Sequence, residues 1–207
     1  MARVFLLSPA NASGERAALL LRDAAAFPLA REVRSPAGAP LGEVFSFLSG
    51  LYFRGKLAYA RAFGEASLVI TPDRGLVAPD VTMHVDDLRA MALVPIELRE
   101  PRYRRPLERD AAALARRLGE DEVVLLGSVA SAKYTDVLLA ALGGRLLFPV
   151  DFVGRGDMSR GGLLLRAARA GTELAYVPVA GAVLRGKRPP KLPPLHRGRD
   201  GEGPWRR

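Results

Sequence analysis

Short apolar runs alternate with longer helical patterns along most of this chain, and this alternation constrains the fold more than any other feature. Four runs are compatible with buried strands: residues 2–7, 67–71, 121–127 and 145–150. A fifth run, residues 173–179, is compatible with an edge strand. Strands that alternate with helices favour a largely parallel sheet covered by helices, so the sequence predicts an α/β fold.

Helical patterns fill most of the intervening segments. The expected helices are residues 14–27, 50–63, 85–91, 107–118, 130–142 and 158–170. Ser13 is the expected N-cap of the first helix. Residues 28–44, with three prolines, are expected to be mostly loop. Residues 99–106, with four arginines around Tyr103, are also an expected loop, either solvated or a phosphate clamp with a stacking tyrosine.

The positive charge of the chain concentrates at its C-terminal end. The whole sequence carries a formal net charge of +9. Residues 185–207 contain eight Lys/Arg and two acidic residues, a net charge of +6, which leaves +3 for residues 1–184. We therefore expect a single α/β domain over residues 1–184 and a disordered, basic, Pro- and Arg-rich tail over residues 185–207.

Composition disfavours several classes of site and location. The chain has no cysteine, which excludes disulfides and thiolate chemistry and fits a reducing cytoplasm. Its only histidines, His84 and His196, are far apart in sequence, so neither a metal centre nor a cofactor is expected. The first apolar run is too short for a signal peptide, and no stretch has the length of a membrane span. The sequence predicts a cytoplasmic protein that does not contact membranes.

Residues 45–80 contain the densest run of glycine, aromatic and basic residues. Within it, Gly50-x4-Gly55-Lys56 approaches the phosphate-binding P-loop. That motif continues with a Ser or Thr whose hydroxyl holds magnesium, and here Leu57 follows. A nucleotide triphosphatase is therefore disfavoured.

The expected helix over residues 50–63 mixes apolar and basic positions. The apolar residues compatible with one face are Leu51, Tyr52, Leu57, Ala58 and Ala62. Interleaved with them are Arg54, Lys56 and Arg61. This pattern predicts basic side chains beside an aromatic residue on one helix.

Three residues are candidates for acid–base catalysis. Asp73 and Asp80 lie in an expected turn and could act as bases, although most loop aspartates only shape turns. His84 follows shortly after, near two more aspartates, and is equally compatible with a site residue or a capping histidine. A Ser-His-Asp hydrolase is disfavoured because no Gly-x-Ser-x-Gly element occurs.

Several short motifs occur in an order that resembles a known family. They are Leu-Leu-Ser-Pro-Ala at residues 6–10, Gly50-x-Tyr52, the strand and Gly-Leu-Val-x-Pro turn of residues 68–79, and the strand with Ala-x3-Tyr of residues 123–134. A looser element is Ser159-Arg160-Gly161 with Arg166. Together they resemble the YaaA family of bacterial peroxide-stress proteins and a related group of bacterial and archaeal α/β domains.

The chain also departs from the pattern of that family. Asn11 stands where YaaA proteins carry lysine, and Thr71 stands where the relatives prefer serine. The spacing between Arg160 and Arg166 also differs from that of the family. Any chemistry that needs the family lysine would be lost here.

The resemblance implies a cleft at the strand ends, formed by residues 8–9, 50–56, 71–79 and 128–134. Ligands favour that edge of a parallel sheet on general grounds as well. The candidate nucleic-acid or ligand-binding residues are Ser8, Asn11, Tyr52, Arg54, Lys56, Thr71, Arg74, Gly75, Tyr134, Arg160 and Arg166.

The favoured function is nucleic-acid binding, in DNA maintenance or protection from oxidative stress, as the resemblance to YaaA proteins implies. The cleft arginines and Lys56 would contact phosphates, Tyr52 or Tyr134 would stack on a base, and the tail would add affinity. One alternative is a metal-independent enzyme that acts on a nucleoside- or nucleotide-like substrate. A second alternative is a non-catalytic domain whose tail docks on another protein.

Overall fold

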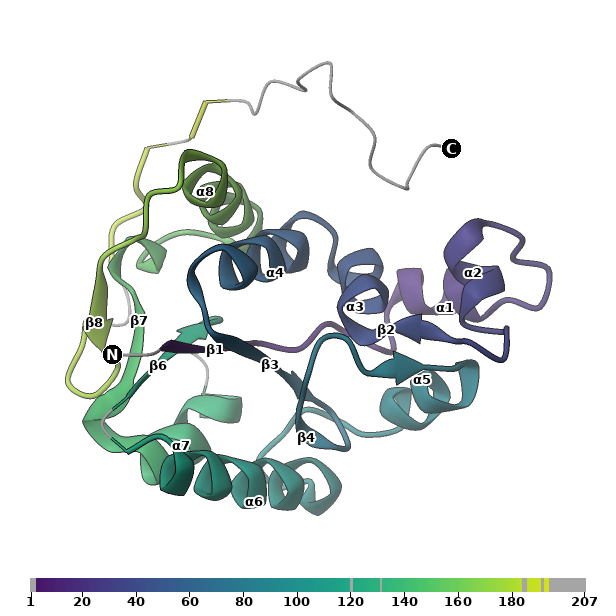
Figure 1. Ribbon diagram of the computed structural model, residues 1–207, viewed down its shortest axis with the longest axis horizontal. Helices are drawn as coiled ribbons and strands as arrows, with labels where there is room; N and C mark the ends of the chain where they lie inside the picture. The colour runs from purple at the N-terminus through teal and green to yellow at the C-terminus, as the bar shows by residue number, and fades with distance from the viewer. Residues whose placement is uncertain (1–2, 120, 131, 184–185, 191, 194–207) are drawn as a thin grey trace.

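A computed structural model describes residues 3–119, 121–130, 132–183, 186–190 and 192–193, and its described part has the predicted α/β architecture (Figure 1). One sheet holds six strands in the order β4-β3-β1-β6-β7-β8. In chain order the strands are β1 (Arg3–Leu7), β3 (Ala66–Thr71), β4 (Gly75–Val77), β6 (Glu122–Leu126), β7 (Leu146–Pro149) and β8 (Tyr176–Pro178). The four middle strands are parallel, and the short edge strands β4 and β8 run antiparallel to their neighbours. The four predicted buried strands and the edge strand are thus confirmed.

Helices cover both faces of the sheet (Figure 1). The helices α3 (Leu41–Ser49), α4 (Leu51–Phe63) and α8 (Asp157–Ala170) lie on one face. The helices α6 (Pro101–Arg117) and α7 (Ala132–Leu142) lie on the other. Beyond the carboxyl ends of the strands are α1 (Glu15–Leu21), α2 (Pro28–Glu32), α5 (Val85–Ala92) and a small ladder of β2 (Ala39–Pro40) and β5 (Thr82–Met83).

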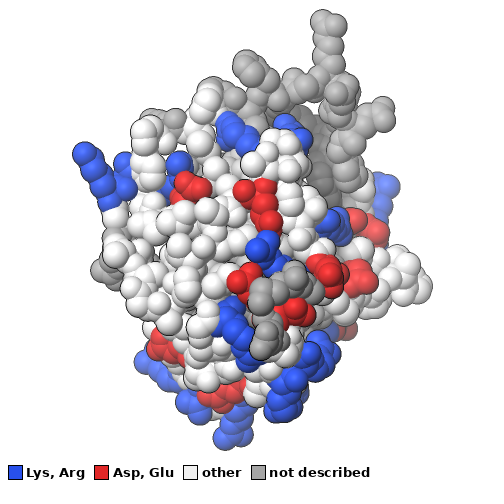
Figure 2. Space-filling model, turned by 60° about the vertical axis from the view of Figure 1, so that its left-hand side comes forward, with Lys and Arg blue, Asp and Glu red and all other residues white. Residues whose placement is uncertain are grey.

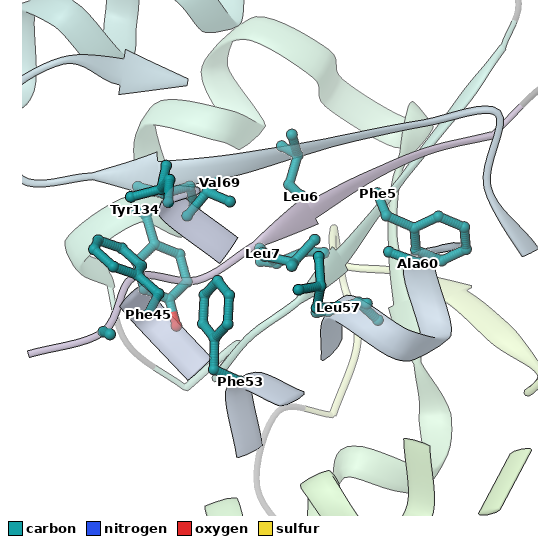
Figure 3. Close-up of a cluster of buried hydrophobic side chains, with 14 of the residues drawn as sticks. Phe5, Leu6, Leu7, Phe45, Phe53, Leu57, Ala60, Val69 and Tyr134 are labelled. Carbon is teal, nitrogen blue, oxygen red and sulfur yellow. The ribbon is translucent and has the colours of Figure 1, made fainter. Parts of the chain in front are cut away.

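The position of strand β1 at the centre of the sheet explains why its sequence is apolar. Phe5, Leu6 and Leu7 are fully buried because helices cover both faces. Figure 3 shows Phe5 and Leu7 on the side of α4 residues such as Phe53 and Leu57, and Leu6 pointing to the opposite face of the sheet. The strand pairs with β3 and β6, so its last residue, Leu7, lies beside the ends of both neighbours. The residue that follows, Ser8, therefore begins the carboxyl edge of the sheet.

Two glycines bring helices α4 and α8 into backbone contact. A Cβ atom on Gly55 would lie 2.5 Å from the carbonyl oxygen of Gly161, and one on Gly161 would lie 2.7 Å from that of Leu51. No side chain fits in this crossing, so both positions need glycine. The contact places Lys56 and Arg160, each next to one of these glycines in sequence, close to the end of β1.

Two expectations about loops and caps are wrong near the N-terminus. Residues 28–44 contain α2 and the start of α3, because Pro28 occupies the first turn of α2, where the missing N–H costs nothing. Ser13 does not cap α1, since its N–H and hydroxyl both donate to Asn11 Oδ1. The N-cap of α1 is Gly14, and the helix ends at Leu21 rather than at residue 27.

The arginine-rich segment at residues 99–106 is mostly helix rather than the expected loop. Helix α6 begins at Pro101, and Glu100 caps it by accepting a hydrogen bond from the Arg102 N–H. Tyr103 is fully buried on the inner face of this helix, so it cannot be a stacking platform. Pro101 is a favourable first helical residue, so the chain enters α6 here instead of a loop.

The predicted tail lies only partly within the described residues. Residues 186–190 and 192–193 form no helix or strand, and Arg166 on α8 donates a hydrogen bond to the Pro193 carbonyl. The rest of residues 185–207 lies outside the described residues. Among the helices of the described residues, none combines the length and the apolar character needed to cross a bilayer.

The glycine contact leads to a stability prediction. Gly55→Ala should lower the free energy of unfolding by about 1–3 kcal/mol, because the new methyl group would meet backbone rather than a movable side chain. Gly144→Ala is the matched control, since a Cβ there meets nothing within 4 Å. Urea denaturation of both variants measures the difference. Equal stability of the two variants would contradict the close crossing.

Candidate functional site

Five polar side chains from four segments meet at the carboxyl end of β1, and we refer to them as the buried cluster. They are Ser8, Tyr52, Lys56, Tyr134 and Arg160. Ser8 directly follows β1, while α4, α7 and α8 supply the other four. All five are at least nine-tenths buried. The sequence predicted all five as ligand-binding candidates, and the structure brings them together.

Lys56 is the most unusual member of the cluster. Its side chain is fully buried, and its amine donates to the Ser8 carbonyl at 2.6 Å and to Ser8 Oγ at 2.9 Å. The ring centroids of Tyr52 and Phe53 lie 4.4 and 4.8 Å from Nζ. Burial lowers the pKa of Lys56 to about 7, because the ammonium form loses its hydration, and Asp157 opposes this only in part.

Tyr134 anchors the loop that follows β6. Its hydroxyl accepts a hydrogen bond from the Ser128 N–H at 2.8 Å and donates to the Ser128 carbonyl at 2.9 Å. Gly127 allows this approach, since a Cβ there would lie 2.8 Å from Ser8 Cβ and 3.1 Å from the Tyr134 hydroxyl. The Ser8 N–H also donates to the Leu126 carbonyl at 3.2 Å, so a short polar bridge joins the ends of β1 and β6.

Tyr52 and Arg160 complete the cluster on the side of α8. The Tyr52 hydroxyl is buried beside the Arg160 guanidinium, which can donate to its oxygen, while its own proton has no acceptor among the described residues. Burial raises the pKa of this hydroxyl, and the positive charge of Arg160 opposes the rise. The Arg160 guanidinium donates to the Phe152 carbonyl at 3.2 and 3.3 Å and lies 3.4 Å from an Asp157 carboxylate oxygen.

A cavity of about 500 Å³ lies beside the cluster at the same edge of the sheet, and we call it the strand-end cavity. Its lining residues are Pro9–Ser13, Pro72, Met91–Ile96 and Lys133. Pro9 follows Ser8 and Lys133 precedes Tyr134, so the cavity wall and the buried cluster share two chain segments. Asn11, Ser13 and Lys133 supply polar groups to a wall that is otherwise apolar.

Asn11 is the one predicted ligand-binding residue among those that line this cavity; the members of the buried cluster lie behind the wall. It is exposed, and its Oδ1 accepts hydrogen bonds from the N–H and hydroxyl of Ser13. Thr71 and Gly75 instead shape the turn between β3 and β4, where the Thr71 hydroxyl donates to the Gly75 carbonyl. A Cβ on Gly75 would clash with Asp110.

The predicted arginines do not share one cleft. Arg54 is exposed on α4, whereas Arg160 is buried in the cluster. Arg74 pairs with Asp73 and Asp87, which offset its charge. Arg166 donates to backbone carbonyls, including that of Pro193.

The three predicted catalytic candidates lie outside the buried cluster. Asp73 has one buried carboxylate oxygen without a partner among the described residues, and burial raises the pKa of its carboxyl group. Asp80 is exposed in the turn before β5. His84 occupies the N-cap position of α5, where its N–H donates to Asp87 Oδ2 at 2.8 Å. The capping interpretation of His84 therefore fits the geometry.

The sequence analysis misplaced Lys56 and missed part of the site. Residues 51–63 are one continuous helix, so the P-loop-like spacing forms no phosphate loop. Lys56 lies on the buried face with Tyr52, Phe53 and Ala60, not among exposed arginines. The sequence did contain a signal for the burial of Lys56, because positions 52, 53, 56 and 60 have the spacing of one helix face. Residues 91–96 of the cavity wall carry no such signal.

Comparison with known proteins adds no identification. No family model, no curated protein and no solved structure matches the chain. The resemblance to YaaA proteins stays a prediction. Within the described residues, no group of three or more His, Cys, Asp or Glu side chains could hold a metal ion.

The buried amine predicts how stability depends on pH. The pKa of Lys56 is about 7 in the folded protein and near 10.5 when exposed, so between these values the unfolded chain binds one more proton. The free energy of unfolding should therefore rise with pH in this window, by up to about 1.4 kcal/mol per unit. Denaturation between pH 7 and about 9.5, below the range where tyrosines titrate, measures the slope.

Lys56→Met should flatten this slope, because methionine fills the site without a titrating group. Lys133→Met, at an exposed position on α7, should keep it. The same slope in the wild type and in Lys56→Met would show that Lys56 is charged in the folded protein.

Proposed function

We propose that the protein is an enzyme that acts on a small nucleoside- or nucleotide-like substrate at the carboxyl edge of the sheet. One observation carries this proposal: the Lys56 amine is completely buried and contacts Ser8 Oγ at 2.9 Å, at the end of the central strand. A general base works best when its pKa lies near the operating pH. Perturbed pKa values of this kind cluster at functional sites.

Lys56 is the general base in this proposal. With a pKa of about 7, a large fraction of the amines is neutral near neutral pH and can accept a proton. Ser8 and Tyr134 hold the polar surroundings of the amine in place through the bridge between β1 and β6. This role replaces Asp73 and Asp80, which lie outside the buried cluster.

The strand-end cavity is the proposed substrate site. Its volume of about 500 Å³ falls in the range of small-molecule pockets, and its wall combines apolar side chains, which suit a flat ring, with polar groups. Asn11, Ser13 and Lys133 offer polar groups at the wall. Its position at the carboxyl ends of β1, β3 and β6 is where open α/β sheets bind ligands.

Nucleic-acid binding is a second candidate function, favoured by the solvent face of α6. Four arginines share this face, which lies opposite buried Tyr103 and Leu114. Their spacings of three, four and seven residues match the helical repeat, and they are Arg102, Arg105, Arg109 and Arg116. All four are exposed. Basic side chains gather at the bottom of the molecule in Figure 2, the side where Figure 1 places α6. A row of arginines of this kind suits a phosphate backbone.

The enzyme proposal predicts a specific loss of activity. Wild-type protein should turn over at least one member of a nucleoside and nucleotide panel, followed by mass spectrometry. Its kcat/KM should rise with pH through about 7. Lys56→Met should lower kcat/KM by roughly 10²-fold or more. Arg54→Ala, two residues away on the exposed side of α4, should keep the wild-type rate.

Two results would contradict this proposal. One is a panel in which no compound is bound or converted. The other is a turnover rate that is unchanged in Lys56→Met.

The nucleic-acid proposal predicts a charge-reversal effect on α6. Arg102 and Arg109 pair with Glu100 and Asp110, so Arg105 and Arg116 should carry most of the binding. Reversing both to Glu should weaken DNA or RNA binding and reduce the log–log salt slope by about 0.9 per lost phosphate contact. Fluorescence anisotropy across a salt series measures both quantities.

The matched control reverses Arg22 and Arg31, which are exposed near α1 and on α2, and produces the same change in net charge. It should keep most of the binding. An equal loss in the two double variants would show that net charge, rather than the face of α6, determines binding.

A further inference from the structure

Two buried basic side chains share the cluster, and one exposed carboxylate lies beside them. Lys56 is fully buried and has no carboxylate within ion-pair distance among the described residues. Arg160 lies 3.4 Å from Asp157, whose side chain is 67% exposed. Buried charges in proteins are normally paired, because an unpaired ion loses its hydration without compensation. The cluster therefore gains an unpaired positive charge whenever Lys56 is protonated.

The Tyr52 hydroxyl adds an unused donor to these basic side chains. The hydroxyl is buried beside the Arg160 guanidinium, which cannot accept a proton, so its O–H has no acceptor in the described part of the chain. Lys56 Nζ lies 4.4 Å from its ring centroid, and Arg160 is near enough to influence its pKa. A buried hydroxyl without a partner costs free energy, so a missing acceptor is the simplest explanation for its position.

The guanidinium of Arg160 also has donor capacity to spare. Its three hydrogen bonds, to the Phe152 carbonyl and the Asp157 carboxylate, measure 3.2 to 3.4 Å. Charge-assisted hydrogen bonds are usually shorter, about 2.7–2.9 Å. Arginine offers five N–H groups, so a better acceptor could replace or add to these contacts.

The start of α8, the helix that carries Arg160, is open to solvent. Gly156 is the N-cap of this 14-residue helix, and no side chain caps the helix there. A Cβ atom on Gly156 would meet nothing within 4 Å. The first N–H groups of a helix attract anions, so they add to the positive potential beside Arg160.

We infer that Tyr52, Lys56 and Arg160 form a subsite for a phosphate-type oxyanion. An oxyanion offers several acceptors at once, which would satisfy the Tyr52 hydroxyl, the spare N–H groups of Arg160 and the charge of Lys56. This inference rests on the proposed function, because the oxyanion would be the phosphate group of a nucleotide substrate. The subsite narrows the proposed substrates from nucleoside- or nucleotide-like molecules to those that carry a phosphate group.

Anion binding should be linked to proton uptake. A negative charge near Lys56 favours its ammonium form and raises the pKa of the amine. The other titratable or charged groups that face Lys56 are Tyr52 on α4, Tyr134 on α7, and Asp157 and Arg160 on α8. At pH 8 both tyrosines are protonated, because burial raises the pKa of each hydroxyl. Lys56 is therefore the group that would take up the proton, and with a phosphorylated substrate bound it would act as a neutral base only at a pH above the value of about 7 that holds for the free protein.

The test uses inorganic phosphate and sulfate as probes, with chloride at equal ionic strength as the reference. Isothermal titration calorimetry of the full chain should show that both oxyanions bind more tightly than chloride. Tyr52→Phe should weaken phosphate binding roughly tenfold, because it removes one donor to a charged acceptor. It should leave folding intact, since the hydroxyl proton has no acceptor to lose among the described residues.

Tyr103→Phe is the matched control. Its hydroxyl is also buried without a partner among the described residues, but neither Lys56 nor Arg160 contributes to its raised pKa. Phosphate binding in this variant should equal that of the wild type. Sulfate titrations at pH 8, in two buffers of different ionisation enthalpy, should show proton uptake in the wild type and none in Lys56→Met.

Three results would overturn the subsite: oxyanions that bind no better than chloride, equal affinities in Tyr52→Phe and Tyr103→Phe, or no proton uptake with sulfate. The proposed function fails separately. Oxyanion binding that depends on Tyr52, without turnover of any nucleotide, supports the subsite and contradicts the enzyme. Turnover of nucleosides and nucleotides alike, with no effect of Tyr52→Phe, supports the enzyme and contradicts the subsite.

Discussion

The contact between the Lys56 amine and Ser8 is the interaction on which the site depends. Burying an amine without a carboxylate partner is costly, and a neutral amine reduces this cost. The fold makes the burial unavoidable, because Lys56 lies on the face of α4 that packs against the sheet. The close crossing at Gly55 and Gly161 also packs α8 against α4 next to Lys56. Packing, more than any charged neighbour, therefore sets the chemistry of this lysine.

The same arrangement explains why the functional residues come from distant parts of the chain. Parallel strands deliver their following loops to one edge, so Ser8 after β1 and Gly127 after β6 become neighbours. Helices α4 and α7 each start at this edge and add Tyr52 and Tyr134. A buried polar cluster and an open cavity then lie side by side, one suited to proton transfer and the other to holding a ring.

The alternation of apolar runs and helical patterns was enough to predict the α/β fold and its main strands. The five members of the buried cluster were also among the predicted ligand-binding residues. The sequence could not reveal how deeply each basic side chain is buried. Lys56 and Arg54 are two residues apart and both basic, yet Lys56 is buried and Arg54 is exposed. Tertiary packing decides this difference. The loop expected around Tyr103 was wrong because proline marks helix starts as well as loops.

The most direct test of the account is the pKa of Lys56 itself. The chain has four lysines, at positions 56, 133, 187 and 191, so selective ¹³C labelling at Cε gives few signals to assign through single substitutions. An NMR titration should show one lysine with a pKa of about 7, and that signal should disappear in Lys56→Met. A spectrum in which all four lysines titrate near 10.5 would contradict the neutral amine and the general base built on it.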